Sequence, residues 1–135
     1  MRRFLARATL AATLFVSGVA GPVSAAPVHA QQTPIEDWDS SYGPVALDFN
    51  LHIGIWFNSQ NPAWIGVIDK WSYDRATRIL TVNYFQDWNN QTGLATLMLS
   101  EDGLGLNGTW SQQPAGTSGE WALTRTAPSL LLQQS

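Results

Sequence analysis

The sequence predicts an all-β fold, a small antiparallel meander that closes into a barrel of about seven or eight strands and contains an internal duplication. Three observations support this prediction. Short segments in which apolar and polar residues alternate are separated by turn residues, which is typical of antiparallel strands. No segment after the first 30 residues shows helical periodicity over three turns. A motif near the start of the predicted domain also recurs 50 residues later in the chain.

The recurring motif is Asp-Trp-(Asp/Asn), followed by turn residues, a glycine and an alternating segment. It covers Asp37–Phe49 and then Asp87–Leu99, and the two copies align without a gap. Further along, Gly54-Ile55-Trp56 is matched by Gly108-Thr109-Trp110. Small changes of offset between the matches are what insertions in turns produce in a duplicated unit. We therefore expect two repeat halves that each begin with an aspartate–tryptophan turn, residues 37–86 and 87–126.

The first 30 residues have the layout of an export signal. Three arginines within the first seven residues precede a mostly apolar run, residues 8–20, and small residues then lead to candidate cleavage sites after Ala25 and Ala30. The apolar run is shorter than the roughly 20 residues that a membrane-spanning helix needs. We therefore expect residues 1–30 to be a signal peptide, the protein to be exported to the periplasm or the exterior, and no membrane span to remain after processing.

The charge of the remaining chain argues against a nucleic-acid partner. Of the seven basic residues, three lie in the first 30 residues, whereas all ten acidic residues lie beyond them. The four basic and ten acidic residues that remain give a net charge of −6, compared with −3 for the full chain. Such a chain has little with which to neutralise phosphates. Because it has no cysteine, burial and hydrogen bonding must hold the domain together, and its seven tryptophans are expected to dominate the core.

The expected domain organisation has one barrel domain. Residues 31–36 form a flexible lead-in, residues 37–126 the barrel and residues 127–135 a C-terminal tail. Alternation predicts that Ala95, Leu97 and Leu99 point inward, and that a glycine in each Gly-x-Trp segment makes room for the indole two residues later. The expected strands cover residues 44–50, 52–58, 63–71, 79–87, 94–100, 104–112 and 119–125.

The segments Gly108-Thr109-Trp110 and Gly119–Arg125 resemble the strands of small exported bacterial β domains with repeated Gly-x-Trp motifs. The resemblance covers residues 37–125. A more distant resemblance is to the avidins and lipocalins, which also use a Gly-x-Trp segment. It implies a barrel that holds a small ligand inside. The polar ring with which avidins bind biotin does not map onto this sequence, so biotin binding is not implied.

The sequence predicts no catalytic site. After cleavage at Ala30, His52 is the one histidine left, and it lies in a predicted strand of a chain without a Gly-x-Ser-x-Gly turn. One histidine and no thiolate also argue against zinc. Asp39 and Asp87 would be a carboxylate pair for a hydrolase if the repeat brought both turns together, but among ten acids some pair is always available. We therefore expect a non-enzymatic protein without a cofactor.

The first aspartate–tryptophan segment has some features of a calcium loop. Asp37, Asp39 and Ser41 alternate as oxygen donors, and Asp48 stands near the position of the last ligand. However, the following glycine comes one place late, and Asp48 is shorter than the usual glutamate. Side chains of this type also cap turns by bonding to the backbone two residues on. We expect turn-capping in both copies, and no metal site.

The expected function is the binding of a small molecule or glycan. Trp56, Trp110 and Trp121 follow glycines on strands and are expected in the core. The tryptophans of the repeated turns either plug the barrel ends or form a stacking platform for a planar ligand. The alternative is a protein-facing module, such as a protease inhibitor or an envelope component, that acts through its loops; the sequence does not distinguish a monomer from an oligomer. The predicted ligand-binding residues are Trp38, Tyr42, Trp64 and Trp88.

Overall fold

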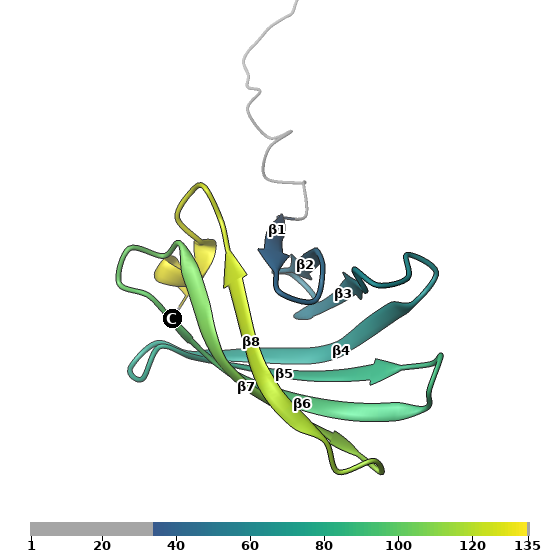
Figure 1. The fold of residues 1–135 in the computed structure, drawn as a ribbon. Helices are drawn as coiled ribbons and strands as arrows, with labels where there is room; N and C mark the ends of the chain where they lie inside the picture. Colours follow the sequence, from purple (N-terminus) through teal and green to yellow (C-terminus); the bar gives the residue numbers. More distant parts are fainter. Residues whose placement is uncertain (1–33, 135) are drawn as a thin grey trace, which may run out of the picture. The chain divides into compact units, whose positions relative to one another are not determined.

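The computed structural model describes residues 34–134, in which eight antiparallel strands form a closed barrel in sequential order (Figure 1). This arrangement confirms the predicted all-β meander. The predicted export signal, with both cleavage sites, and the lead-in as far as Thr33 lie outside the described residues. The strands are β1 (Ile35–Ser40), β2 (Val45–Asp48), β3 (Ile53–Phe57), β4 (Ile65–Asp74), β5 (Ile79–Gln86), β6 (Gln91–Leu99), β7 (Gly105–Gln113) and β8 (Ser118–Thr124).

The barrel interior is filled by side chains that alternate along the strands. On β6, Ala95, Leu97 and Leu99 are buried as predicted, and Leu80 and Val82 of β5 point into the same core. Eight strands enclose a space that side chains just fill, which explains how a small barrel without disulfides has a continuous core. Within residues 34–134, no helix is long and apolar enough to cross a membrane.

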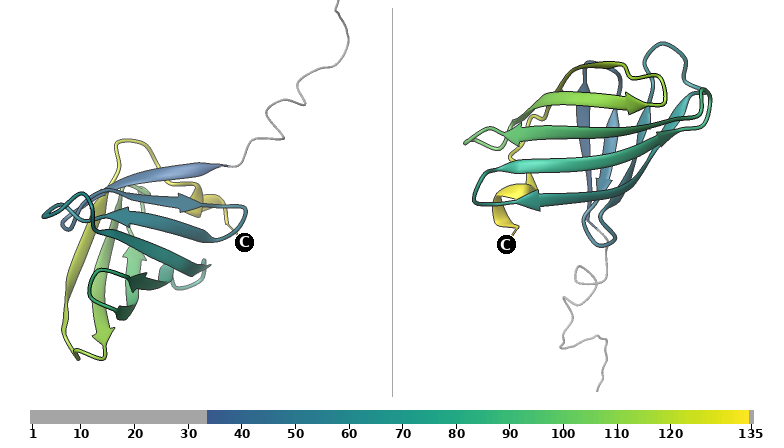
Figure 2. Two further views of the ribbon diagram at one scale, coloured as in Figure 1. Left: turned by 90° about the vertical axis from the view of Figure 1, so that its right-hand side faces the viewer. Right: turned by 90° about the horizontal axis from the view of Figure 1, so that it is seen from below.

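The two ends of the barrel differ (Figure 2). One end carries the β2–β3, β4–β5 and β6–β7 turns and the C-terminal 3-10 helix η1 (Leu130–Gln133), whose Leu131 is fully buried in the core. We call it the plugged end. The other end carries the remaining four turns, and we call it the cavity end. The C-terminal tail predicted for residues 127–135 is thus partly a plug of the barrel.

The prediction that Asp37–Gly43 forms a turn is wrong. Residues as far as Ser40 belong to β1, which starts within the expected lead-in and pairs Glu36 with Leu47 and Trp38 with Val45. The turn begins only at Ser41, and it is capped by Ser40, whose Oγ accepts a hydrogen bond from the backbone N–H of Tyr42 at 3.2 Å. The second copy does form the expected turn, at residues 87–90. The two copies of the motif therefore have different secondary structure.

The buried carboxylate of Glu36 joins β1 to the C-terminal segment. Its Oε1 accepts hydrogen bonds from Trp38 Nε1 at 3.0 Å and from Ser129 Oγ at 2.6 Å. Its Oε2 accepts one from the backbone N–H of Leu130 at 2.7 Å and lies 3.9 Å from Arg125 Nη2. A carboxylate that is 97% shielded from water needs such partners, because an unpaired buried charge is very costly.

Aromatic side chains of the inner wall lie over glycines of the neighbouring strand. Trp56 is directly opposite Gly66 in the β3–β4 register, and a Cβ added at Gly66 would overlap the Trp56 ring. Tyr84 covers Gly93 on β6 in the same way. A Cβ at Gly119 would come within 2.8 Å of Trp110, its partner on β7. Cross-strand pairs of this kind place a large ring where the opposite strand has no side chain.

This finding corrects the expected role of the Gly-x-Trp segments. The atoms nearest to a Cβ added at Gly54 belong to Ala46, Leu47 and Ile68 rather than to Trp56. The glycine that accommodates each of these rings therefore lies directly opposite it on the neighbouring strand, and not two residues earlier in the chain.

We predict that Gly66→Ala destabilises the barrel by about 1–3 kcal/mol, because the new methyl group must displace a buried indole. Trp56 has little freedom to move, since its Nε1 donates to the Tyr42 carbonyl at 3.1 Å. Urea unfolding would measure the change. Gly105→Ala is the matched control, because its Cβ would meet no atom closer than 3.7 Å. An equal effect of the two substitutions would contradict the explanation.

We also predict that Glu36→Ala lowers the free energy of unfolding by about 2 kcal/mol or more, because Trp38 Nε1, Ser129 Oγ and the Leu130 N–H lose their acceptor. The control is Glu101→Ala, which removes an exposed carboxylate in the β6–β7 turn and should change stability by less than about 0.5 kcal/mol. Thermal or urea unfolding of both variants tests the prediction. A Glu36→Ala protein as stable as the control would show that the network is unimportant.

Candidate functional site

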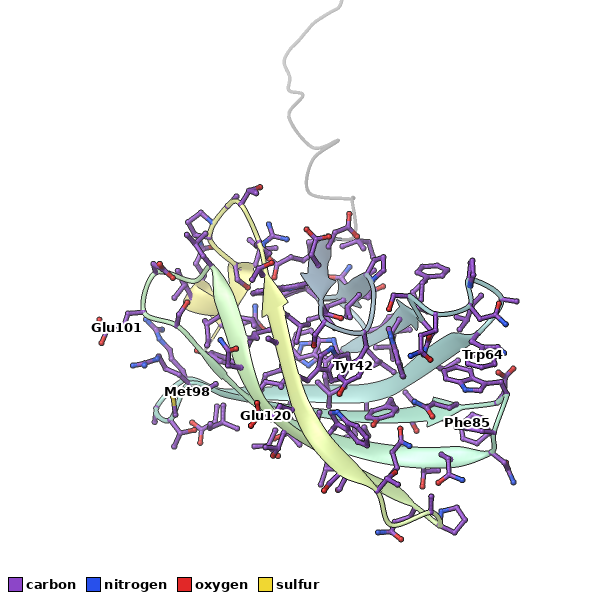
Figure 3. All side chains as sticks on the ribbon, in the orientation of Figure 1. Tyr42, Trp64, Phe85, Met98, Glu101 and Glu120 are labelled. Carbon is purple, nitrogen blue, oxygen red and sulfur yellow. The ribbon has the colours of Figure 1, made fainter. Side chains whose placement is uncertain are left out.

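A cavity of about 370 Å³ lies at the cavity end of the barrel. It is lined by side chains from β3, β5, β7 and β8 and from three of the four turns at that end. Figure 3 shows Trp64 at this end, where the β3–β4 loop leads into β4, and Glu101 at the opposite end. The cavity thus lies between the packed core and the turns of the cavity end, at the opposite end of the barrel from η1.

The floor of the cavity consists of three buried aromatic rings. Trp56 and Tyr84 meet edge to face, with ring centroids 5.6 Å apart and planes at 87°. Tyr84 and Trp121 have the same arrangement at 6.0 Å and 71°, and Trp56 and Trp121 are 5.6 Å apart. Because each ring contacts the other two, the floor is a rigid apolar surface that prefers an aromatic or other flat apolar group.

The rim contains a stacked tryptophan pair from two different connections. Trp64, at the end of the β3–β4 loop, and Trp88, in the β5–β6 turn, lie nearly parallel at 5°, with centroids 5.6 Å apart. Trp88 also meets Trp56 of the floor at 5.6 Å. Both rim rings are only partly buried, so they offer aromatic surface at the opening.

On the opposite side of the rim, Tyr42 joins the β1–β2 turn to β7 and β8. Its hydroxyl accepts a hydrogen bond from Trp110 Nε1 at 3.3 Å, and its ring packs edge to face against Trp110 and Trp121. These contacts hold Tyr42 in place although it lies in a turn.

Five amide side chains line the cavity, and two of them, Gln86 and Gln112, lie at inward strand positions of its walls. Gln112 is already engaged, since its Oε1 accepts from Tyr84 Oη at 3.1 Å and its Nε2 donates to Thr117 Oγ1 at 3.4 Å. Gln86, at the end of β5, is only 4% exposed, and its side-chain amide makes no hydrogen bond to any described residue. The Trp121 Nε1, by contrast, is fully buried and without a partner among residues 34–134.

The cavity has an uncharged lining. No aspartate, glutamate, histidine, lysine or arginine contributes to it. Burial raises the pKa of Tyr84 well above its usual range, and the neighbouring Tyr42 raises it further, so the Tyr84 phenol stays neutral. A charged ligand group placed here would lose its hydration without gaining a counter-charge.

The structure brings together three of the four predicted ligand-binding residues. Tyr42, Trp64 and Trp88 line the cavity. Trp38 does not: it is 1% exposed, its Nε1 is bonded to Glu36, and the Arg125 guanidinium lies 5.6 Å from its ring. Trp38 is a core residue of β1, because its copy of the motif is a strand and not a turn.

The remaining sequence candidates lie outside the cavity. Asp37 and Asp39 are exposed on β1, and Asp87 is exposed in the β5–β6 turn. Among residues 34–134, the side chains of Asp37, Asp39 and Asp87 accept none of the turn-capping bonds expected for them, so that prediction is wrong for both copies. His52 stacks on Trp71 at 4.1 Å near the plugged end. Residues 34–134 contain no group of three acidic or histidine side chains that could hold a metal ion.

Sequence reasoning missed part of this site. Trp56 and Trp121 are buried as expected, and Trp110 packs against the core, but all three also line the cavity. Gln86 was not singled out, although the alternation of β5 places it on the same side as Leu80, Val82 and Tyr84. A polar residue that continues an inward-facing apolar series was the available signal.

Comparisons of the chain with protein-family models, curated proteins and solved structures find no match. The resemblance to avidins and lipocalins therefore stays an expectation, and the antiparallel barrel is what the structure shows.

We predict that the stability of the protein falls as the pH rises above about 10, partly through Tyr84. Its folded-state pKa is raised above the unfolded value, so its contribution is complete below the unfolded pKa and is lost as the pH rises towards the folded one. Urea unfolding at about pH 9 and pH 11 measures the loss, and Tyr84→Phe should reduce it. An identical loss in Tyr84→Phe would contradict the prediction.

Proposed function

We propose that the protein is a non-enzymatic binding module for a small uncharged molecule, either an aromatic compound or a sugar. The observation that carries this proposal is the aromatic cavity at one end of the barrel, which has an uncharged lining. Concave, largely apolar pockets with a few polar groups are typical of small-molecule sites. The volume of about 370 Å³ is near the lower end of the usual range for such sites, which favours a ligand of one or two rings.

The lining also supports binding rather than catalysis. General acid–base catalysis needs a group whose pKa lies near the working pH. The cavity contains amides, hydroxyls and aromatic rings, and burial moves the pKa of Tyr84 away from neutrality. The residues expected for a hydrolase, Asp39 and Asp87, are both outside it.

The export of the protein and the alternative of a protein-facing module stay predictions. Detection of the protein in the secreted or periplasmic fraction tests the first. Capture of a specific partner by the wild type that survives Trp88→Ala would favour the second.

We predict that calorimetric titration with matched ligands shows a preference for uncharged compounds. Indole and methyl β-glucoside represent the neutral classes, and indole-3-acetate and glucuronate are their charged counterparts. At least one neutral compound should bind, and its charged counterpart should bind at least about tenfold more weakly, because the cavity provides no counter-charge. Trp88→Ala should weaken binding by about tenfold or more, since an aromatic contact is worth roughly 1–3 kcal/mol.

The control is Met98→Ala, which removes an exposed side chain from the outer face of β6 and should leave affinity unchanged. Equal binding of charged and neutral partners, or equal effects of the two substitutions, would contradict the proposed site.

A further inference from the structure

We propose that the cavity recognises an uncharged heteroaromatic ring with a hydrogen-bond donor next to an acceptor, and that the Gln86 amide binds this edge. The inference rests on the proposed function, because it concerns the ligand class of the same cavity. It selects among neutral ligands a ring of the kind found in nucleobases and cyclic amides, rather than a sugar.

The unengaged Gln86 amide is the first observation. Gln86 is 96% shielded from water and lines the cavity, yet its side-chain amide makes no hydrogen bond to any residue that the structure describes. The Gln86 Oε1 and Nε2 are not among the fully buried unpaired atoms of residues 34–134, so both keep contact with the solvent in the cavity. An amide that no protein group engages, at the surface of an aromatic cavity, is free to pair with a ligand.

The aromatic floor is the second observation. Trp121 lines the same cavity with Trp56 and Tyr84, and the three ring centroids lie 5.6–6.0 Å apart. The Trp121 Nε1 is buried away from solvent, so a ligand in the cavity meets the ring and not its N–H. A free amide beside three aromatic rings indicates a flat ligand with a polar edge.

The geometry of an amide determines which ligand edge fits Gln86. Its carbonyl oxygen accepts and its NH₂ group donates side by side in one plane. The complementary edge has an N–H donor beside a C=O or ring-nitrogen acceptor, as when glutamine binds adenine through two parallel hydrogen bonds. The aromatic floor meanwhile offers its faces and edges to the ring that carries this edge.

A sugar satisfies this arrangement less well. A hexose brings a hydroxyl on nearly every carbon, and each one needs a partner once it leaves water. Beside the aromatic floor, Gln112 already bonds to Tyr84 and Thr117, and the Tyr42 hydroxyl accepts from Trp110. The other polar residues of the lining, such as Ser59, Gln60 and Asn89, belong to the turns at the opening. A ring with one polar edge leaves fewer groups unpaired than a ring that is polar all round.

The absence of charge limits the ligand further. No lysine or arginine lines the cavity, so a phosphate attached to the ring would have no counter-charge within it. The expected ligand is thus a free base, nucleoside-like or cyclic-amide ring, and not a nucleotide.

The test uses calorimetric titration of the full protein with three probes: 2-quinolone, N-methyl-2-quinolone and methyl β-glucoside. The first has an N–H donor beside its carbonyl acceptor, and the second has the same ring without the donor. We expect 2-quinolone to bind the wild type at least about tenfold more tightly than the methylated probe, as a bidentate contact predicts. Gln86→Met, which keeps the length of the side chain, should reduce this ratio to less than about threefold.

Binding of N-methyl-2-quinolone to Gln86→Met checks that this variant retains the cavity. Should Gln86→Met fail to fold, Gln86→Leu replaces it, because it also removes the amide and places an apolar side chain at the same inward position of β5. Equal binding of both quinolones to the wild type, a ratio unchanged in the variant, or binding of the glucoside alone would overturn the inference and leave the proposed function intact. Failure of all three probes, with no ligand found in the wider neutral panel, would overturn both.

Discussion

The seam between β1 and β8 is the constraint on which the barrel depends. These two strands pair at only two positions, Asp39 with Thr124 and Ser40 with Leu123, whereas β7 and β8 pair at seven. The Glu36 carboxylate reinforces the seam by holding the segment that follows β8. Closure brings the ring of Tyr42, which follows β1, next to the ring of Trp121 on β8, with the two ring centroids 6.4 Å apart. The wall of the cavity therefore forms only when the barrel closes.

The two ends of the barrel separate stability from binding. At the plugged end, Leu131 of η1 fills the interior, and Phe49 packs on Trp71 with ring centroids 5.0 Å apart. At the cavity end no segment takes the corresponding place among the described residues, and rings from the turns and strands surround a space instead. The glycines opposite Trp56 and Tyr84 let these rings lie flat against the wall. The Trp56–Gly66 and Tyr84–Gly93 pairs therefore also position two of the rings that form the cavity floor.

The strand pattern could be predicted from the sequence, but β1 and part of the site could not. In β2 and in β5 to β8 the alternation of apolar and polar residues follows burial closely enough to identify the strand. In β4 it does not, because Ile65 and Val67 are exposed and the register shifts between Ile68 and Lys70. In β1 it is reversed, because Ile35 is 55% exposed while Glu36 is buried. The reason lies 93 residues away, where Ser129 supplies a partner for the carboxylate. Trp38 and Trp88 share a motif but differ in environment, since pairing partners decide whether a short polar segment becomes a strand or a turn.

The unpaired Trp121 N–H at the cavity end has a thermodynamic cost. Each buried polar group without a partner costs about 1–3 kcal/mol, which is a substantial part of the roughly 5–15 kcal/mol that stabilises a small domain. This domain has no cysteine and so no disulfide to offset that cost. At the plugged end, by contrast, the Glu36 carboxylate is satisfied by three hydrogen bonds. The same chain satisfies a buried charge at one end, whereas at the other it leaves the Gln86 amide unengaged and in contact with solvent, and this amide is the group that we propose binds a ligand.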